Sequence, residues 1–248
     1  MPSFASQQHV LCDALMISVN NRPKLLTPAF FNRDPRIVAS VLLGKLLIRK
    51  TPRGILAGRI VETEAYLGSG DDAAHATAGR TARNSVLWGP PGHAYVYFVY
   101  GNHYCLNVSC LPDGVPGCIL LRALEPVAGL EAMARARGIK LPKQPRFSSE
   151  HRVAGPHHSE ARKELLKLRE ISSGPGRLCE ALGVTRDRDN GKSFVSPRSD
   201  LQILEDHYRV REVRIGPRIG ITKSAHHPLR YVIAGNPFVS GTKLPVVH

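Results

Sequence analysis

The chain has 248 residues, of which 42% are hydrophobic and 22% are charged, so it is long and apolar enough for one globular domain with a buried core. Its formal net charge of +14 is high and predicts a strongly anionic partner, nucleic acid first and a membrane surface second. Membrane binding is disfavoured because the sequence has neither a basic amphipathic helix nor an apolar run of about 18 residues. The mildly apolar start of the chain is broken by Asp13 and lacks the basic region of a signal peptide, so we expect a cytoplasmic protein.

The cysteines are odd in number and include no C-x-x-C pair; they are Cys12, Cys105, Cys110, Cys118 and Cys179. This pattern favours neither a disulfide framework nor an iron–sulfur or zinc site. We therefore expect buried free thiols and no metal.

The first half of the chain predicts a leader, a helix and a hairpin. Residues 1–24 are mixed in composition and predict a flexible leader, which leaves 25–248 for a single folded domain. Asp34-Pro35 is typical of a helix start, and the apolar spacing of this helix runs to Leu42. The β-rich runs 46–48 and 55–67 are separated by turn residues and predict a hairpin.

A second hairpin is predicted over 94–110, which is rich in strand-forming residues and has Gly101-Asn102 at its centre. The elements expected after it are a strand over 118–123, a helix over 126–137, a basic solvated loop over 139–163, helices over 165–169 and 175–183, and further strands within 201–239. Ser173 is expected to cap the last helix, with Pro175 in its first turn. Because strands outnumber helices and short turns join them, we expect a single α+β domain on an antiparallel core.

The run 59–67 places two carboxylates on one surface. Alternation along a strand puts Ile60, Glu62, Glu64 and Tyr66 on one face and a wholly uncharged set on the other, which is expected to pack on the core. The polar face is either solvated, with the glutamates paired with arginines, or the wall of a cleft. A flexible loop after Gly68 brings His75 close to the same strand end, although a lone histidine is more often structural than functional.

The second hairpin concentrates four of the seven tyrosines within ten residues, namely Tyr95, Tyr97, Tyr100 and Tyr104. Tyr95 and Tyr97 share a strand face, and we expect Tyr95 to belong to a cross-strand aromatic ladder. Tyr100 stands beside the turn, where a ring has little protein to pack on. An exposed aromatic tip on a basic protein is typical of a wedge or stacking platform for nucleic-acid bases.

These residues belong to a longer series of ordered blocks. The blocks are Val61-Glu62-Thr63-Glu64-Ala65-Tyr66-Leu67-Gly68, Ala74-His75, Arg80-Thr81-Ala82-Arg83-Asn84, Gly89 to Tyr97, Asn107, Leu120 to Pro126, Ser173-Gly174-Pro175, Arg218 to Ile221, and Pro228-Leu229-Arg230. In this order the chain resembles the alkyladenine (3-methyladenine) DNA glycosylase family over roughly Leu26 to Ser240. The resemblance implies a curved, partly open, barrel-like β core flanked by helices, with a protruding hairpin that inserts into DNA.

The resemblance also implies roles for the matched residues. Glu64 is expected to be the general base that deprotonates a water, and Arg122 and the backbone near Ile219 are expected to position that water. The expected walls of the base pocket are Tyr66, His75 and Tyr97. Asn107 is expected to disfavour guanine, and Tyr100 to fill the gap left in the base stack.

Residues on the basic surface are expected to contact the DNA backbone. We predict that Arg80, Arg83 and Arg177 lie near phosphates. Two features depart from the family pattern: Asn102 replaces an apolar residue expected at the hairpin tip, and the basic stretch 138–165 matches poorly.

The implied activity is that of a monofunctional glycosylase of base excision repair, acting as a monomer on double-stranded DNA. It flips alkylated or deaminated purines (3-methyladenine, 7-methylguanine, hypoxanthine, ethenoadenine) out of the duplex and hydrolyses the N-glycosidic bond, which leaves an abasic site. No metal or organic cofactor is expected, and Lys223 is expected to form no Schiff base.

Two alternatives remain at this stage: a non-catalytic basic module that binds distorted nucleic acid, and a hydrolase of free nucleosides. The first has no use for Glu64 and Arg122 together, and the second has little need for the high charge. Glu62 shares a face with Glu64, and we expect its replacement by glutamine to be mild.

Overall fold

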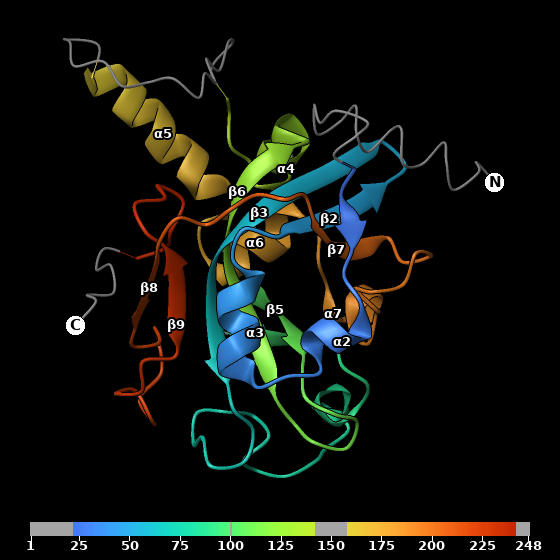
Figure 1. The fold of residues 1–248 in the computed structure, drawn as a ribbon. Coiled ribbons are helices and arrows are strands. Elements are labelled where there is room, and N and C mark those ends of the chain that lie inside the picture. The colour runs from blue at the N-terminus through green and yellow to red at the C-terminus, as the bar shows by residue number, and fades with distance from the viewer. Residues whose placement is uncertain (1–21, 100, 142–157, 242–248) are drawn as a thin grey trace.

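The computed structural model describes residues 22–99, 101–141 and 158–241. Within these ranges nine antiparallel strands form one sheet in the order β1-β7-β2-β3-β6-β5-β4, with β9 paired to β3 and β8 paired to β9. The strands are β1 (Lys24–Leu25), β2 (Leu46–Thr51), β3 (Gly54–Tyr66), β4 (Ala94–Val99), β5 (His103–Ser109), β6 (Cys118–Ala128), β7 (Leu201–Glu205), β8 (Val213–Gly216) and β9 (Arg230–Ile233). The sheet curls around the core, and short helices pack against it (Figure 1). The expected α+β fold with a curved antiparallel core is confirmed.

The helices of the described residues are mostly short. They are α2 (Pro28–Phe31), α3 (Pro35–Leu42), the 3-10 helix η2 (Ser85–Trp88), α4 (Leu130–Ala136), α5 (His158–Ser172), α6 (Pro175–Ala181) and α7 (Arg186–Asp189). The predicted start of α3 is confirmed, because the Asp34 side chain accepts a hydrogen bond from the Arg36 backbone N–H at 2.8 Å. In this part of the chain no helix is long and apolar enough to cross a bilayer.

The long strand β3 organises the sheet. β2 pairs with its first half, β9 replaces β2 along Glu62 to Glu64, and β6 follows the opposite edge. The pairing with β6 is irregular around Glu62, which lies opposite Ala123, and Arg122 falls at the register shift between this pair and the next one, Thr63 with Leu121. Because strands on both edges and the core enclose this stretch, Glu62 and Glu64 are fully buried. Buried carboxylates require partners, since an unpaired buried charge is very costly.

Two predicted elements near β6 differ from the structure. The helix expected over 126–137 is a strand up to Ala128 and a helix only from Leu130, because the long β3 pairs with residues 125–128. The loop expected over 139–163 is helical from His158, since α5 buries Leu168 and Ile171 against its neighbours. Residues 142–157 lie outside the described residues.

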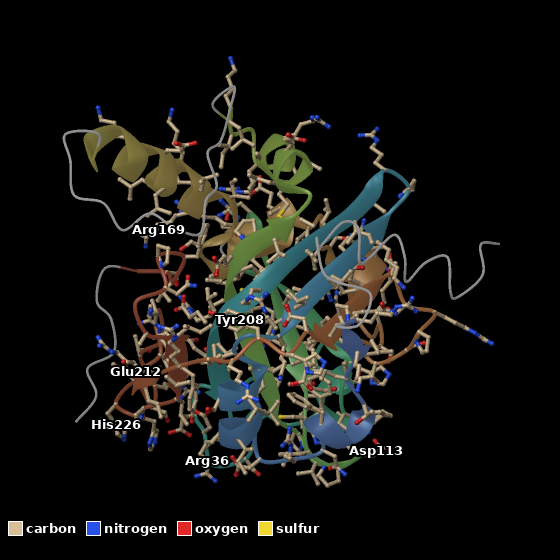
Figure 2. The ribbon with its side chains drawn as sticks, turned by 45° about the horizontal axis from the view of Figure 1, so that its top comes forward. Arg36, Asp113, Arg169, Tyr208, Glu212 and His226 are labelled. Atoms are coloured by element: carbon tan, nitrogen blue, oxygen red, sulfur yellow. The ribbon has the colours of Figure 1, made fainter. Side chains whose placement is uncertain are left out.

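The helix predicted over 175–183 forms as α6, with Pro175 in its first turn. Its N-cap is Gly174 rather than the expected Ser173, and no side chain caps it. The connection that follows β7 crosses the sheet towards β8, and Tyr208 on it lies over the strands (Figure 2). Arg59 of β3 fastens this connection, because its guanidinium stacks 4.0 Å from the Tyr208 ring centre and pairs with Asp206 at 2.8 Å.

Candidate active site

Two buried glutamates and one arginine form the centre of the candidate site. Arg122 Nε donates to Glu62 Oε1 at 3.0 Å, and Arg122 Nη1 lies 3.2 Å from Glu64 Oε1. A single guanidinium that reaches both carboxylates confirms that Glu62 and Glu64 share a face of β3. One interpretation of the sequence was that this face is solvated. The structure shows that it is not, because both side chains are fully buried.

Glu64 has two further hydrogen-bond donors. The Ile219 backbone N–H donates to Glu64 Oε1 at 2.8 Å, and the Tyr66 hydroxyl donates to Oε2 at 3.0 Å. Burial raises the pKa of Glu64, and the charge of Arg122 acts against this. Burial and the neighbouring Glu64 raise the pKa of Tyr66, so its hydroxyl keeps the proton that it donates. Glu64 is therefore a stronger base than a free glutamate, with its two oxygens oriented by three donors.

A second ion pair fastens the loop that supplies Ile219. Arg218 donates to both carboxylate oxygens of Asp71, at 2.6 and 2.7 Å, and to the Ala65 carbonyl at 3.0 Å. Its guanidinium lies 4.6 Å from the Tyr66 ring centre, so it covers one face of that ring. Burial acts to raise the pKa of Asp71, but Arg218 and backbone N–H groups outweigh it and hold the pKa below its usual range. This pair joins the segment before Ile219 to the end of β3.

Gly68 allows the chain to turn directly after β3. Its φ is +83°, a left-handed conformation that favours glycine. A Cβ atom there would lie 1.9 Å from the Pro116 carbonyl oxygen, which is closer than any side chain can approach. The turn directs the following residues back towards β4, where His75 meets the tyrosines.

Three aromatic side chains from this loop and β4 make one cluster. His75 Nδ1 lies 2.8 Å from the Tyr95 hydroxyl, and the ring centres of His75 and Tyr97 are 4.5 Å apart in an edge-to-face arrangement. The Tyr95 and Tyr97 rings lie 5.5 Å apart, which confirms that they share a strand face. Burial raises the pKa of Tyr95 to about 12. Burial and the charge of Arg83 lower the pKa of His75, so the imidazole is neutral at neutral pH.

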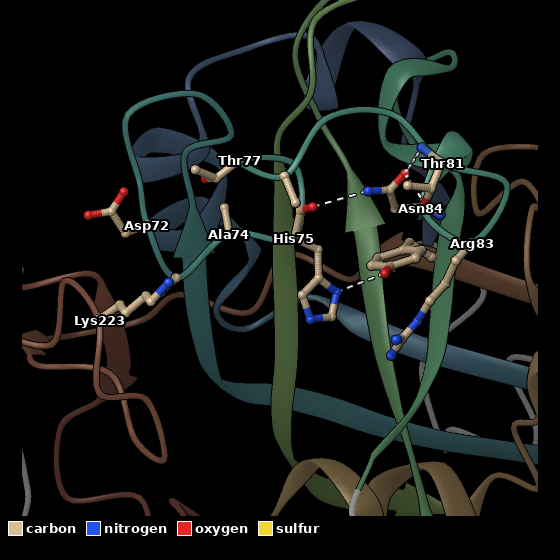
Figure 3. Close-up of a pocket in the computed structure, with 11 residues that line it drawn as sticks. Asp72, Ala74, His75, Thr77, Thr81, Arg83, Asn84 and Lys223 are labelled. Atoms are coloured by element: carbon tan, nitrogen blue, oxygen red, sulfur yellow. Dashed lines mark hydrogen bonds between the residues drawn. The ribbon is translucent and has the colours of Figure 1, made fainter.

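A pocket of about 530 Å³ opens beside His75 and Tyr95 (Figure 3), a size that suits small ligands. In Figure 3 the side chains of Arg83 and Lys223 lie on opposite sides of His75, and both residues line the pocket. Asn84 fixes the loop at this pocket, since its amide donates to the His75 carbonyl at 3.0 Å. Glu64 does not line this opening. Tyr66 and Tyr97 pack on the same small apolar cluster as Tyr95. The Tyr66 hydroxyl also donates to Glu64, so Tyr66 connects this cluster to the buried glutamate.

The other expected pocket residue, Asn107, is buried on β5 opposite Tyr95. Its amide nitrogen donates to the Tyr95 carbonyl at 3.0 Å, and its amide oxygen lies 4.0 Å from the Cys118 sulfur. The described cysteines, Cys105, Cys110, Cys118 and Cys179, are free and buried as expected, and Cys12 lies outside the described residues.

The expected DNA contacts lie at the surface around the second hairpin. Arg80 and Arg83 are exposed, and Arg83 donates to the Phe98 carbonyl near the end of β4. Arg177 is exposed on α6, which packs against β5. Tyr100 lies outside the described residues, and Asn102 is exposed in the turn.

Comparison with known families identifies the group of proteins to which this chain belongs. A family model described as methylpurine-DNA glycosylase matches residues 29–237. The chain belongs to the methylpurine-DNA glycosylase family. It is therefore a DNA glycosylase, a hydrolase of N-glycosyl bonds.

Similar proteins cover nearly the whole of this glycosylase. A protein of Koribacter versatilis, provisionally named 3-methyladenine DNA glycosylase, is 62% identical over 88% of the chain and 94% of its own length. Proteins with the same provisional name from Methanocella arvoryzae and Burkholderia cenocepacia are 42% and 41% identical, over 85% and 88% of the chain and 93% of each relative.

Several residues that build the candidate site were not assigned a role from sequence. They are Asp71, Arg218, Arg230 and Ser240. Arg218 and Arg230 fall within blocks that carry the family resemblance, which is the signal that could have marked them. Their partners lie 147 and 168 residues away along the chain, so no local pattern reveals the pairing. Among the described residues no group of three or more His, Cys, Asp or Glu is arranged to hold a metal ion.

Proposed function

We propose that this glycosylase removes alkylated and deaminated purines from double-stranded DNA, with Glu64 as the base that activates the attacking water. The observation that carries the proposal is the environment of Glu64, a buried carboxylate of raised pKa that three donors orient beside a tyrosine and histidine cluster. Cleavage of a purine N-glycosidic bond develops positive charge on the sugar. A nearby carboxylate both stabilises that charge and accepts a proton from the water that traps it.

The two oxygens of Glu64 are suited to different tasks. Oε1 is engaged by the Ile219 N–H and by Arg122, whereas within the described part of the chain Oε2 accepts only the Tyr66 hydroxyl. Since a carboxylate oxygen can accept two hydrogen bonds, Oε2 has capacity for a water. Ile219 and Arg122 contact Glu64 and would help to position the water through it. The water donates to Oε2 and attacks the sugar carbon, its proton passes to Glu64, and the purine leaves with the bonding electrons.

The flipped purine would lie among Tyr66, His75 and Tyr97. Arg218 already covers one face of Tyr66, which leaves the opposite face for the base. Stacking of a positively charged alkylated purine on the tyrosine rings is worth about 1 to 2 kcal/mol. Neutral lesions depend more on hydrogen bonds with His75, whose imidazole is held by Tyr95.

Asn107 would supply the selection against guanine. Its amide is held by the Tyr95 carbonyl and lies against Cys118, so it does not move aside for an exocyclic amine. The cost of such a mismatch is the burial of polar groups without suitable partners.

The hairpin and the arginines around it would bind the distorted duplex. Tyr100 at the tip would fill the gap in the base stack and offset part of the few kcal/mol that flipping costs. Arg80, Arg83 and Arg177 would contact phosphates. No lysine is given the role of a nucleophile, so the product is an abasic site in an uncut strand.

The test uses duplexes that each carry one hypoxanthine, ethenoadenine, 3-methyladenine or 7-methylguanine, incubated with saturating enzyme and then cleaved with alkali. We expect strand breaks at the lesion only after alkali, and none in the undamaged duplex. Free nucleosides should stay intact. Release of none of the lesions would support a non-catalytic DNA-binding module instead.

A matched variant tests the base. Glu64→Gln keeps the shape of the side chain but cannot accept the proton, so single-turnover excision should fall by about 100- to 10,000-fold. Binding of the lesion duplex, measured by fluorescence anisotropy, should remain. A Glu64→Gln enzyme that excises at the wild-type rate would remove Glu64 from the mechanism.

A further inference from the structure

Glu62 lies beside the proposed base but takes no part in the pocket. Its carboxylate is fully buried and accepts three hydrogen bonds: from Arg122 Nε at 3.0 Å and Arg230 Nε at 2.7 Å to Oε1, and from the Ser240 N–H at 2.6 Å to Oε2. It does not line the opening beside His75. The sequence alone predicts a mild effect for replacement of Glu62 by glutamine, but a buried carboxylate with three donors indicates a clear one.

We propose that Glu62 is a positioning residue for excision, which holds Arg122 in the one orientation that directs Nη1 at Glu64. This inference rests on the proposed role of Glu64 as the base. It adds a residue that acts on the reaction through Arg122 without touching the DNA.

The argument begins with the shape of the guanidinium. Its three nitrogens lie in one plane, so an arginine held at Nε has little freedom at Nη1. In Arg122 the three nitrogens have different partners: Nε binds Glu62, Nη1 lies at Glu64, and Nη2 donates to Ser240 Oγ at 3.4 Å. Without Glu62 the guanidinium could rotate to bind Glu64 with two nitrogens, as arginine–carboxylate pairs prefer.

That rotation would weaken the base. A carboxylate that shares its guanidinium with a second carboxylate is less stabilised as an anion than one that has the guanidinium to itself. The negative charge of Glu62 also raises the pKa of Glu64, although burial is the largest cause and Arg122 opposes both. Removal of Glu62 thus acts on Glu64 in one direction by two routes, since the like charge disappears and Arg122 is released towards Glu64. Both lower the pKa of Glu64.

The C-terminal part of the described chain completes this arrangement. Ser240 contributes its backbone N–H to Glu62, its hydroxyl to Arg122 and its carbonyl to Arg230 Nη2 at 2.8 Å. Two carboxylates and two guanidiniums balance in charge within this buried cluster. Buried ion pairs of this kind stabilise a fold poorly compared with apolar residues of the same volume. What they supply here is a fixed position for Arg122.

The experiment compares single-turnover excision of hypoxanthine across pH for wild type, Glu62→Gln and Glu62→Asp. For Glu62→Gln we expect the acid limb of the rate profile to move down by about half a pH unit and the plateau rate to fall about tenfold, while lesion-duplex binding stays within about twofold. Glu62→Asp keeps the charge, so its acid limb should stay in place while the shorter side chain lowers the rate. If Glu62→Gln does not fold, the excision rate of Glu62→Asp serves as the test. A wild-type rate in Glu62→Asp would overturn the proposal.

A control separates positioning from general stability. Asp206→Asn removes another buried carboxylate that pairs with an arginine of β3, and we expect a lower Tm with the wild-type pH profile. The proposal fails if Glu62→Gln behaves like this control, with reduced Tm but unchanged pH profile and rate per folded molecule. Failure of the proposed function is distinguishable, because it would appear as an active Glu64→Gln enzyme.

Discussion

Two buried clusters of acidic residues and cations lie in different parts of this protein, and the pKa values of Glu64 in one and Asp189 in the other are shifted in opposite directions. In the first, Glu62 and Glu64 share Arg122 at the centre of β3. In the second, Arg49 of β2 lies 2.9 Å from Asp189 of α7 and 3.0 Å from Asp200. The pKa of Glu64 is raised by burial, whereas the pKa of Asp189 is lowered although burial acts to raise it.

The difference lies in how many cations each carboxylate has. Asp189 is fully buried, yet Arg49, Arg188 and Lys192 all lie within 3.2 Å of it, and the Thr185 N–H donates to it as well. Among the described residues Glu64 forms an ion pair with one guanidinium, that of Arg122, which it shares with Glu62. The same types of residue therefore make an inert structural anchor in one place and a basic carboxylate in the other.

The largest expected effects are opposite ones at Glu64 and Asp189: replacement of Glu64 should impair excision but not stability, and replacement of Asp189 should impair stability but not excision. Because the folded-state pKa of Glu64 is raised, its contribution to stability is complete below the unfolded pKa and is lost as pH rises through the folded pKa. Glu64→Gln should therefore raise the Tm at neutral pH and lower the excision rate by about 100- to 10,000-fold. Differential scanning calorimetry at pH 7 provides the measurement, and a lower Tm in this variant would contradict the assigned pKa direction.

Asp189→Asn should have the opposite outcome. Removal of one partner from a buried ion pair costs about 3 to 5 kcal/mol, which corresponds to a fall in Tm of roughly 10 °C in a chain of this size. The lowered pKa means that this stability is present above the unfolded pKa and is lost as pH falls through the folded pKa. Excision per folded molecule should match wild type in single-turnover assays, and a rate loss as large as that of Glu64→Gln would erase the distinction between the clusters.

The pH dependence of the wild-type enzyme sharpens the comparison. Only ionised Glu64 accepts a proton, so the excision rate should rise with pH through an apparent pKa above the ordinary glutamate value of about 4.5. Substrates of neutral charge, such as hypoxanthine, keep the titration of the lesion out of this range. An apparent pKa at or below the ordinary glutamate value would mean that the charge of Arg122 lowers the pKa of Glu64 by more than burial raises it.

The surface arginines should have a smaller effect. Arg83→Ala should weaken binding of damaged and undamaged duplexes alike and should reduce the slope of log affinity against log salt by about 1. Titrations by anisotropy at several salt concentrations test this. A change confined to the lesion duplex would instead place Arg83 in base recognition.

The smallest effect is expected at the hydrogen bond between Tyr95 and His75. Tyr95→Phe removes the partner of His75 Nδ1 and keeps the ring that packs against Tyr97. Loss of one neutral hydrogen bond is worth about 1 kcal/mol, so excision of neutral lesions should fall by only a few-fold. The loss should be smaller for cationic 7-methylguanine, which depends more on stacking.

Local patterns in the sequence determined much of this protein. Period-two alternation correctly placed Glu62 and Glu64 on one face of β3 and Tyr95 beside Tyr97, and Asp34-Pro35 correctly marked the start of α3. These features depend on neighbours within a few residues, where side-chain direction follows directly from backbone geometry. The ordered motifs also led to the family.

Tertiary structure alone decided the electrostatics and the elements around β6. That Glu62 anchors Arg122 depends on Arg230 and Ser240, which reach it only because β9 replaces β2 along β3. The strand that continues through Ala128 likewise depends on the free edge of β3 rather than on local propensity. Burial and long-range pairing set a carboxylate's pKa, and neither is encoded in the residues adjacent to it, which is why the sequence could suggest a candidate base but not the residues that surround it.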